Sequence, residues 1–195
     1  SSNFRGIRSA FPRDLNPLFM EGYGILEKLK LSFDNYSPDH RRLPVLAELA
    51  KAFPLVPVIV NHLGGKIDHQ ADSTAFADWR QSIDAVAGCS NAYMKVGGAQ
   101  QRVGPWEPVF HNRQRRKPMN SEELCDLLFP YYSYVIEAFG PDRCMFESNF
   151  PVDKECVSYG TLWNMFKRIA ARLGLSEAEK SALFSGTAGR VYRLD

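Results

Sequence analysis

The chain has 195 residues, the size of a single domain, and its 24 basic and 22 acidic residues leave a net charge of +2. This near balance gives no reason to expect a nucleic-acid or anionic-membrane partner, and no stretch approaches the roughly 18 apolar residues of a membrane span. The four cysteines lack metal-ligand spacing and indicate a reducing compartment, so we expect a cytoplasmic protein.

Five short apolar segments alternate along the chain with segments of helical spacing. One of them, residues 57–63, is almost continuously apolar, as expected of a strand buried on both faces. Alternation of this kind predicts a parallel sheet with helices outside it. The expected strands are residues 4–10, 31–36, 57–63, 92–96 and 143–148. The expected helices are residues 18–29, 43–53, 76–86 and 159–173, and two more that begin at Asn120 and Ser176.

Two of these helices begin with a capping-box pattern. Asn120 is followed three residues later by Glu123, and Ser176 by Glu179, so that each pair of side chains can bond backbone N–H groups of the first turn. Pro130 lies inside the first of these helices. Because proline lacks the N–H that a helix interior needs, it predicts a break or a kink there.

Polar residues follow two of the predicted strands at the point where each strand ends. Residues 61–65, Asn-His-Leu-Gly-Gly, follow the third strand, and residues 147–153, Glu-Ser-Asn-Phe-Pro-Val-Asp, follow the fifth. The carboxyl ends of parallel strands meet at one edge, and parallel barrels place their catalytic groups there. The two segments therefore predict part of an active site.

These segments and several others resemble the amidohydrolase-related hydrolases of the "amidohydrolase 2" group, a TIM-barrel family that includes sugar-lactone and pyrone-dicarboxylate lactonases. The resemblance covers nearly the whole chain, and the segment that ends at Asp153 is its most specific part. The matching residues are 4–8, 31–34, 40–44, 61–65, 94–98, 139–153 and 182–194.

The resemblance implies an α/β fold of the (β/α)8 TIM-barrel type. The five predicted strands would be its fourth to eighth, so the chain would lack the first three β/α units. Residues 1–195 then form a single domain, the C-terminal part of such a barrel. A full barrel takes about 250 residues and open parallel edges are unfavourable, so we expect the five strands to be unstable alone. A homodimer is a possibility that the sequence leaves open.

No metal ligand is assigned from this chain. In metal-dependent members of the family, the first strand carries a His-X-His pair that holds a divalent ion. The four histidines here are His40, His62, His69 and His111, and no two of them are two residues apart. A divalent metal such as zinc is therefore expected only if an upstream His-X-His segment exists.

The resemblance places His62 and His40 in the site as strand-end histidines, and neutral imidazole can bind a metal or act as a base near neutral pH. It also places Asn149 where the family carries an aspartate that accepts a proton from the attacking water. An amide cannot be a general base. Either Asp153 or Glu147 takes that role, or the site polarises an activated ester without a metal, or the site is inactive.

Four further residues are candidates for substrate binding. Alternation along the strands places Lys95 in one layer with Glu147 and predicts a buried ion pair, either structural or engaged with the substrate. Arg8, at the end of the first strand, is a candidate to grip an anionic substrate. Asp68 and Trp106 lie in loops above the same face, with Trp106 as a candidate lid.

Three hypotheses of function follow, each with a small molecule as substrate or ligand. The first is hydrolysis of a cyclic ester by water attack, with the histidines positioning the substrate, a carboxylate as base, and Arg8 or Lys95 as the cation. The second is a zinc-dependent decarboxylase of an aromatic or muconate-type acid, against which Asn149 counts. The third is a truncated, catalytically inactive remnant that binds small acids.

Overall fold

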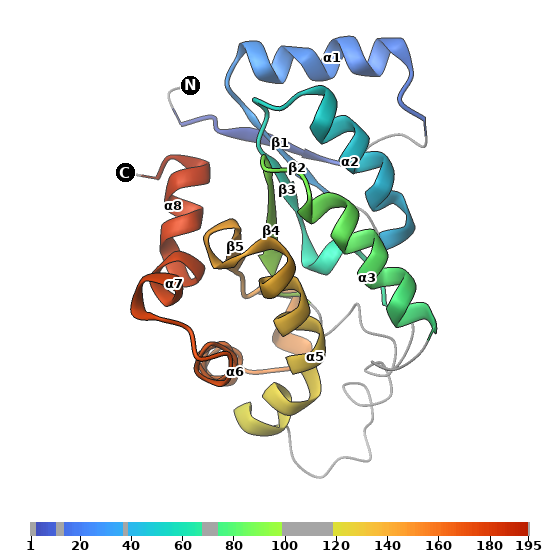
Figure 1. Ribbon diagram of the computed structural model, residues 1–195. Coiled ribbons are helices and arrows are strands. Elements are labelled where there is room, and N and C mark those ends of the chain that lie inside the picture. The colour runs from blue at the N-terminus through green and yellow to red at the C-terminus, as the bar shows by residue number, and fades with distance from the viewer. Residues whose placement is uncertain (1–2, 11–13, 37–38, 68–73, 99–118, 195) are drawn as a thin grey trace.

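The computed structural model describes residues 3–10, 14–36, 39–67, 74–98 and 119–194, which form a five-stranded parallel sheet with helices packed against it (Figure 1). The strands lie in chain order, and every neighbouring pair is parallel. Their bounds are β1 Gly6–Ser9, β2 Ser32–Asn35, β3 Val58–Val60, β4 Ala92–Val96 and β5 Cys144–Phe146. The five predicted strands and their direction are confirmed, while barrel closure and the three absent units stay predictions.

The helices also lie close to the predicted positions, and both capping boxes are formed, at Asn120 and at Ser176. Within the described residues, no helix is both long enough and apolar enough to cross a membrane. The α-helices are α1 Pro17–Lys28, α2 Leu43–Ala52, α3 Thr74–Ala87, α5 Ser121–Phe139, α6 Tyr159–Arg172, α7 Glu177–Ser181 and α8 Thr187–Tyr192. The shorter helical turns are η1 His40–Arg42, η2 His62–Gly64, η4 Pro141–Arg143, η5 Val152–Glu155 and η6 Ala182–Gly186.

The outer face of the sheet carries the main hydrophobic core. Alternate strand residues, among them Val58, Val60 and Met94, are fully buried against the helices. On the helix side, Leu46 of α2 and Trp79 of α3 are fully buried in the same core. Burying one large apolar side chain stabilises a fold by roughly 1.5–3 kcal/mol, so this face holds the sheet and helices together.

The inner face of the sheet carries a second, smaller cluster. Ile59 of β3 and Met145 of β5 are buried with Val191 of α8, and Tyr93 and Tyr192 pack against them. Helix α8 therefore lies across the sheet from α2 and α3 (Figure 1). Along the strands, polar residues that point to the inner face alternate with apolar residues that point to the outer face. The inner face therefore carries the candidate site.

Helix α5 continues through Pro130 from Ser121 to Phe139, so a break is wrong, while the kink that was the other predicted outcome stays a prediction. The missing N–H of Pro130 removes one bond to the preceding turn. Buried side chains lie on both sides of it, including Leu128 and Tyr132, which are fully buried. Burial of the same apolar face before and after the proline therefore holds the two halves in one helix.

Candidate active site

The chain bends sharply where β3 ends, in the left-handed region of backbone conformation. His62 and Leu63 have φ values of 52° and 56°, and Gly64 and Gly65 follow at 80° and 127°. Residues other than glycine rarely adopt such values, and those that do cluster at functional sites. The indole N–H of Trp79 donates to the carbonyl of Leu63 over 2.9 Å and holds this turn.

Two glycines after β4 allow the strand ends to come together. A Cβ at Gly98 would lie 2.5 Å from Nδ1 of His62 and 3.3 Å from Nδ2 of Asn149, and the φ of Gly98 is +67°. A Cβ at Gly97 would clash with the backbone carbonyl of Glu147. Since only glycine leaves this room, His62, Glu147 and Asn149 converge around the Gly97–Gly98 pair.

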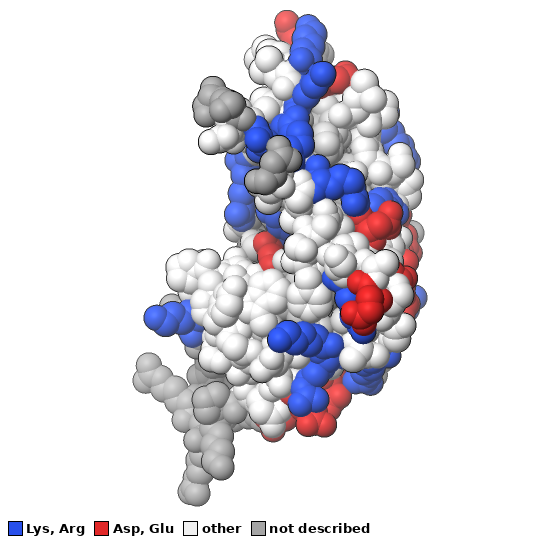
Figure 2. Space-filling view, turned by 90° about the vertical axis from the view of Figure 1, so that its left-hand side faces the viewer, with Lys and Arg blue, Asp and Glu red and all other residues white. Residues whose placement is uncertain are grey.

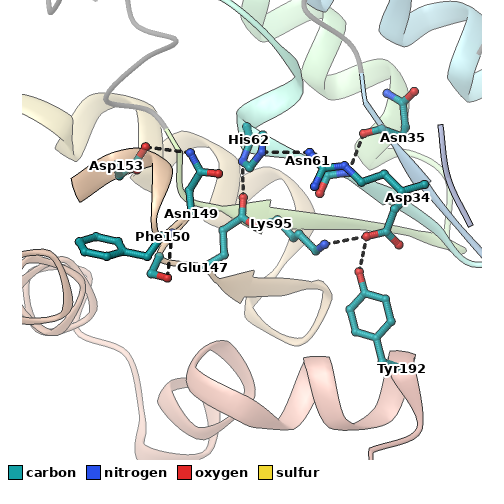
Figure 3. A network of polar contacts seen from close by, with 12 residues as sticks. Asp34, Asn35, Asn61, His62, Lys95, Glu147, Asn149, Phe150, Asp153 and Tyr192 are labelled. Atoms are coloured by element: carbon teal, nitrogen blue, oxygen red, sulfur yellow. Dashed lines mark hydrogen bonds and ion pairs between the residues drawn. The ribbon is translucent and has the colours of Figure 1, made fainter. Parts of the chain in front are cut away.

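His62 bridges a cation and a carboxylate, and Figure 3 shows its contact with the carboxylate of Glu147. Its Nδ1 lies 2.5 Å from Oε1 of Glu147, and its Nε2 lies 3.4 Å from Nη2 of Arg8. A guanidinium has only hydrogen-bond donors, so Nε2 of His62 accepts from Arg8, and Nδ1 faces the carboxylate of Glu147. His62 is 6% exposed, so the three side chains form a chain of charge-assisted contacts largely out of water.

Asn149 follows β5 and also has a left-handed backbone, with φ 52°. Its Nδ2 donates to Oδ1 of Asp153 over 2.8 Å (Figure 3), and the backbone N–H of Asp153 donates to the carbonyl of Asn149 over 3.1 Å. Asp153 is fully buried, whereas Asn149 is half-buried. The carboxylate that contacts His62 is therefore Glu147, and Asp153 supports the amide.

The predicted ion pair between Lys95 and Glu147 is not formed. Nζ of Lys95 lies 2.6 Å from Oδ2 of Asp34, and that oxygen also accepts from the hydroxyl of Tyr192 over 2.7 Å (Figure 3). The strand register explains the difference, because it pairs Lys95 with Met145 and leaves Glu147 beyond the end of the β4–β5 ladder, next to the histidine.

The phenol of Tyr192 is held in its protonated form. Burial raises the pKa of Tyr192 far above its ordinary value, and the neighbouring negative charge of Asp34 raises it further. The hydroxyl therefore stays a hydrogen-bond donor to the carboxylate. Asp34 in turn is held between this phenol and the ammonium group of Lys95, which fixes the position of the cation on the inner face.

His40, also predicted for the site, makes its contact on α3 instead. Nδ1 of His40 lies 3.3 Å from Oγ of Ser82, and that hydroxyl donates to the carbonyl of Asp78 over 2.9 Å. The imidazole of His40 therefore faces α3 and donates to the serine. Asp68 and Trp106 lie outside the described residues, so their placement in the site stays a prediction.

Sequence reasoning missed Asp34 and Tyr192. Asp34 had a signal, because it is a carboxylate in a short apolar strand, and it alternates with Phe33, which is buried in the outer core. Tyr192 had none, since it reaches Asp34 from a helix 158 residues further along the chain. Asn61 was named only as part of the segment 61–65, and its role was not predicted: its amide donates to the carbonyl of Asn35 over 2.8 Å and ties the ends of β2 and β3.

Comparison with known proteins decides the family. The family model described as "Amidohydrolase" matches residues 3–194, nearly the whole chain. The chain belongs to the amidohydrolase family.

Two named proteins and one crystal structure are similar to this chain over most of its length. The y4mH protein of Sinorhizobium fredii is 35% identical, over 99% of this chain and 62% of its own length. An L-fucono-1,5-lactonase of Burkholderia multivorans is 29% identical, over 79% of this chain and 49% of its own. A crystal structure of a zinc-bound amidohydrolase of Burkholderia multivorans is 25% identical with a TM-score of 0.79, and covers 98% of this chain and 65% of that one. The chain thus spans less than two thirds of these relatives.

The described residues of this amidohydrolase chain do not by themselves offer a zinc site. Among its described residues, no three His, Cys, Asp or Glu side chains form a group that could hold a metal ion. Nδ1 of His62 faces Glu147, and Nε2 faces the guanidinium of Arg8, whose positive charge opposes a second cation. Asn149 supplies an amide where zinc prefers imidazole, thiolate or carboxylate. The donor set of these strand ends therefore does not fit zinc.

Proposed function

We propose that the protein hydrolyses a cyclic ester, of the sugar-lactone or pyrone-dicarboxylate type, by water attack at the carbonyl carbon. The observation that carries the proposal is the chain of contacts from Arg8 through His62 to Glu147 at the carboxyl ends of the strands. Membership of the amidohydrolase family supports hydrolysis, and the relative named L-fucono-1,5-lactonase supports a lactone substrate.

In this proposal the attacking water replaces Arg8 at Nε2 of His62, and Nε2 takes a proton from this water. Glu147 orients the ring through Nδ1 and stabilises the imidazolium that forms, the part a carboxylate plays beside a catalytic histidine. Arg8 lies next to Nε2 and stabilises the negative charge that develops on the carbonyl oxygen. The ring C–O bond then breaks, and the proton passes from His62 to the leaving oxygen, which yields an open-chain hydroxy acid.

The remaining residues support binding in this scheme. Lys95 is held in position by Asp34, and its other ammonium hydrogens are available to oxygen atoms of the substrate. Asn149, braced by Asp153, offers its amide to the same space. Lactones are activated esters, so a positioned base and a cation are sufficient for chemistry of this kind.

The test uses the longest natural polypeptide that contains this chain, assayed for proton release with L-fucono-1,5-lactone, other sugar lactones and a pyrone dicarboxylate. We expect His62→Ala to lower turnover at least about a hundredfold, the usual scale of general acid–base help. Glu147→Gln should lower it as well, since the amide no longer stabilises an imidazolium. Glu137→Gln is the matched control, because Glu137 is exposed on α5.

Two results would contradict the proposal. One is a wild-type protein that turns over none of these esters, and the other is unchanged turnover in His62→Ala. If Glu147→Gln and Glu137→Gln lowered turnover equally, Glu147 would have no part in the mechanism as the carboxylate partner of His62.

A further inference from the structure

A cavity of about 400 Å³ lies on the sheet at the end opposite the candidate active site. Its lining includes Ser32, the first residue of β2, and Tyr93, the second residue of β4. His62, Glu147 and the rest of the site follow the last residues of their strands. The length of the strands therefore separates the two places, and the cavity belongs to a different part of the molecule.

Positive charge dominates the lining of this cavity. Lys30, which follows α1, and Arg190 and Arg193 of the C-terminal segment contribute three cations, against the single carboxylate of Glu27. Figure 2, which views the molecule from the side of its two termini, shows Lys and Arg side chains gathered over the upper part of this face. A concave surface with one sign of charge favours a ligand of the opposite sign.

Backbone carbonyls fix the two guanidinium groups. Arg193 donates from Nη1 to the carbonyl of Lys30 over 2.8 Å and from Nη2 to the carbonyl of Arg5 over 3.3 Å. Arg190 donates from Nη2 to the carbonyl of Asp142. Neither guanidinium is neutralised by these carbonyls, and each has five N–H donors, so positioned donors are left for an anion. A ligand would therefore meet groups whose rotamers are already ordered.

We propose that this cavity binds a small organic dianion, a dicarboxylate or a phosphate monoester. The positive charges of the lining complement the negative charge of such a ligand. The volume of the cavity lies within the 300–1,000 Å³ range typical of small-molecule sites. The side chain of Tyr93 and the apolar lining residue Val191 supply contacts for a carbon framework. The site is independent of the proposed lactone chemistry, because it shares no residue with it.

Calorimetric titration of the whole protein with phenyl phosphate and with glutarate tests the proposal, with phenol as the neutral comparator. We expect saturable binding of at least one dianion, no binding of phenol, and affinity that falls with added salt. Lys30→Gln and Arg190→Gln should each weaken binding at least about tenfold, since each removes a charged donor. Lys28→Gln, which removes the same charge two residues away and outside the lining, should bind as the wild type does.

A fourth variant, Arg8→Gln, separates this cavity from the candidate active site. Binding that is lost in Arg8→Gln and kept in Lys30→Gln would place the anion at the active site and overturn the proposal. Absence of saturable binding in the wild type would overturn it too, as would equal weakening in Lys28→Gln and Lys30→Gln. Denaturation curves of each variant confirm that the fold is intact before binding is compared.

Discussion

The two faces of the sheet come from the same strands and differ in kind. On the outer face Val58, Val60 and Met94 are fully buried against the helices. On the inner face Lys95 pairs with Asp34, among only a few apolar contacts. Because successive strand residues point to opposite faces, each strand carries the core in one register and the candidate site in the other. Substitutions on the outer face of the sheet should therefore act on stability, and substitutions on the inner face mainly on function.

The largest effect on stability is expected on the outer face. Leu46→Ala removes a fully buried side chain of α2, and we expect the free energy of unfolding to fall by about 2–5 kcal/mol through lost burial and a residual cavity. Leu18→Ala makes the same change at a position that is 80% exposed, and should stay within about 0.5 kcal/mol of the wild type. Urea denaturation measures both, and equal losses would break the distinction between core and surface.

The inner face should respond less to a comparable change in its polar contacts. Asp34→Asn leaves Lys95 without its counter-charge, and we expect a loss of about 2 kcal/mol. This is less than the roughly 3–5 kcal/mol of fully buried pairs, because the Lys95 side chain keeps 18% of its exposure. The measurement is denaturation of the single variants and of a double-mutant cycle with Lys95→Met.

The matched control for that experiment is Asp126→Asn. Asp126 pairs with Arg172 over 3.0 Å, but the two side chains are 71% and 50% exposed. Water screens such a pair, so its loss should cost less than about 1 kcal/mol. If Asp34→Asn cost no more stability than Asp126→Asn, the ion pair on the inner face would be energetically equivalent to a surface contact. The difference between the two faces of the sheet would then come from their buried apolar area alone.

Much of the fold could be predicted from the sequence because local patterns decide it. The apolar run at residues 57–63 contains β3, and the capping boxes at Asn120 and Ser176 mark the starts of two helices. Of the break or kink predicted at Pro130, the break was wrong, because contacts distant in sequence outweigh one missing backbone hydrogen bond. The residues next to Pro130 in the sequence do not reveal which distant residues they contact.

The candidate site could be predicted only as a set of strand ends. Arg8, His62 and Glu147 were named from their positions at those ends, and the structure brings them together. Which carboxylate meets which cation depends on the strand register and on the left-handed turn at His62, and neither is visible in a single sequence. For the same reason Lys95 was given the wrong partner.

Tyr192 offers the finest test of the inner face, because it couples the C-terminal helix to the strand carboxylate by one hydrogen bond. Tyr192→Phe removes the donor to Asp34, and we expect a loss of about 1 kcal/mol at neutral pH, typical of one hydrogen bond. Tyr159→Phe is the control, since Tyr159 is 54% exposed and its hydroxyl should contribute little. In the Asp34→Asn background the effect of Tyr192→Phe should shrink, because its charged acceptor is gone.

The same contact predicts how stability depends on alkaline pH. Burial and the charge of Asp34 raise the pKa of Tyr192 in the folded protein, so folding favours the protonated phenol. Its contribution is fully present below the unfolded value of about 10 and is lost as pH rises above that value. Unfolding free energies measured from about pH 8 to about pH 11 should therefore fall more steeply for the wild type than for Tyr192→Phe. Parallel curves for the two proteins would mean that α8 leaves the phenol in water, and the inner face would lose its link to the C-terminal segment.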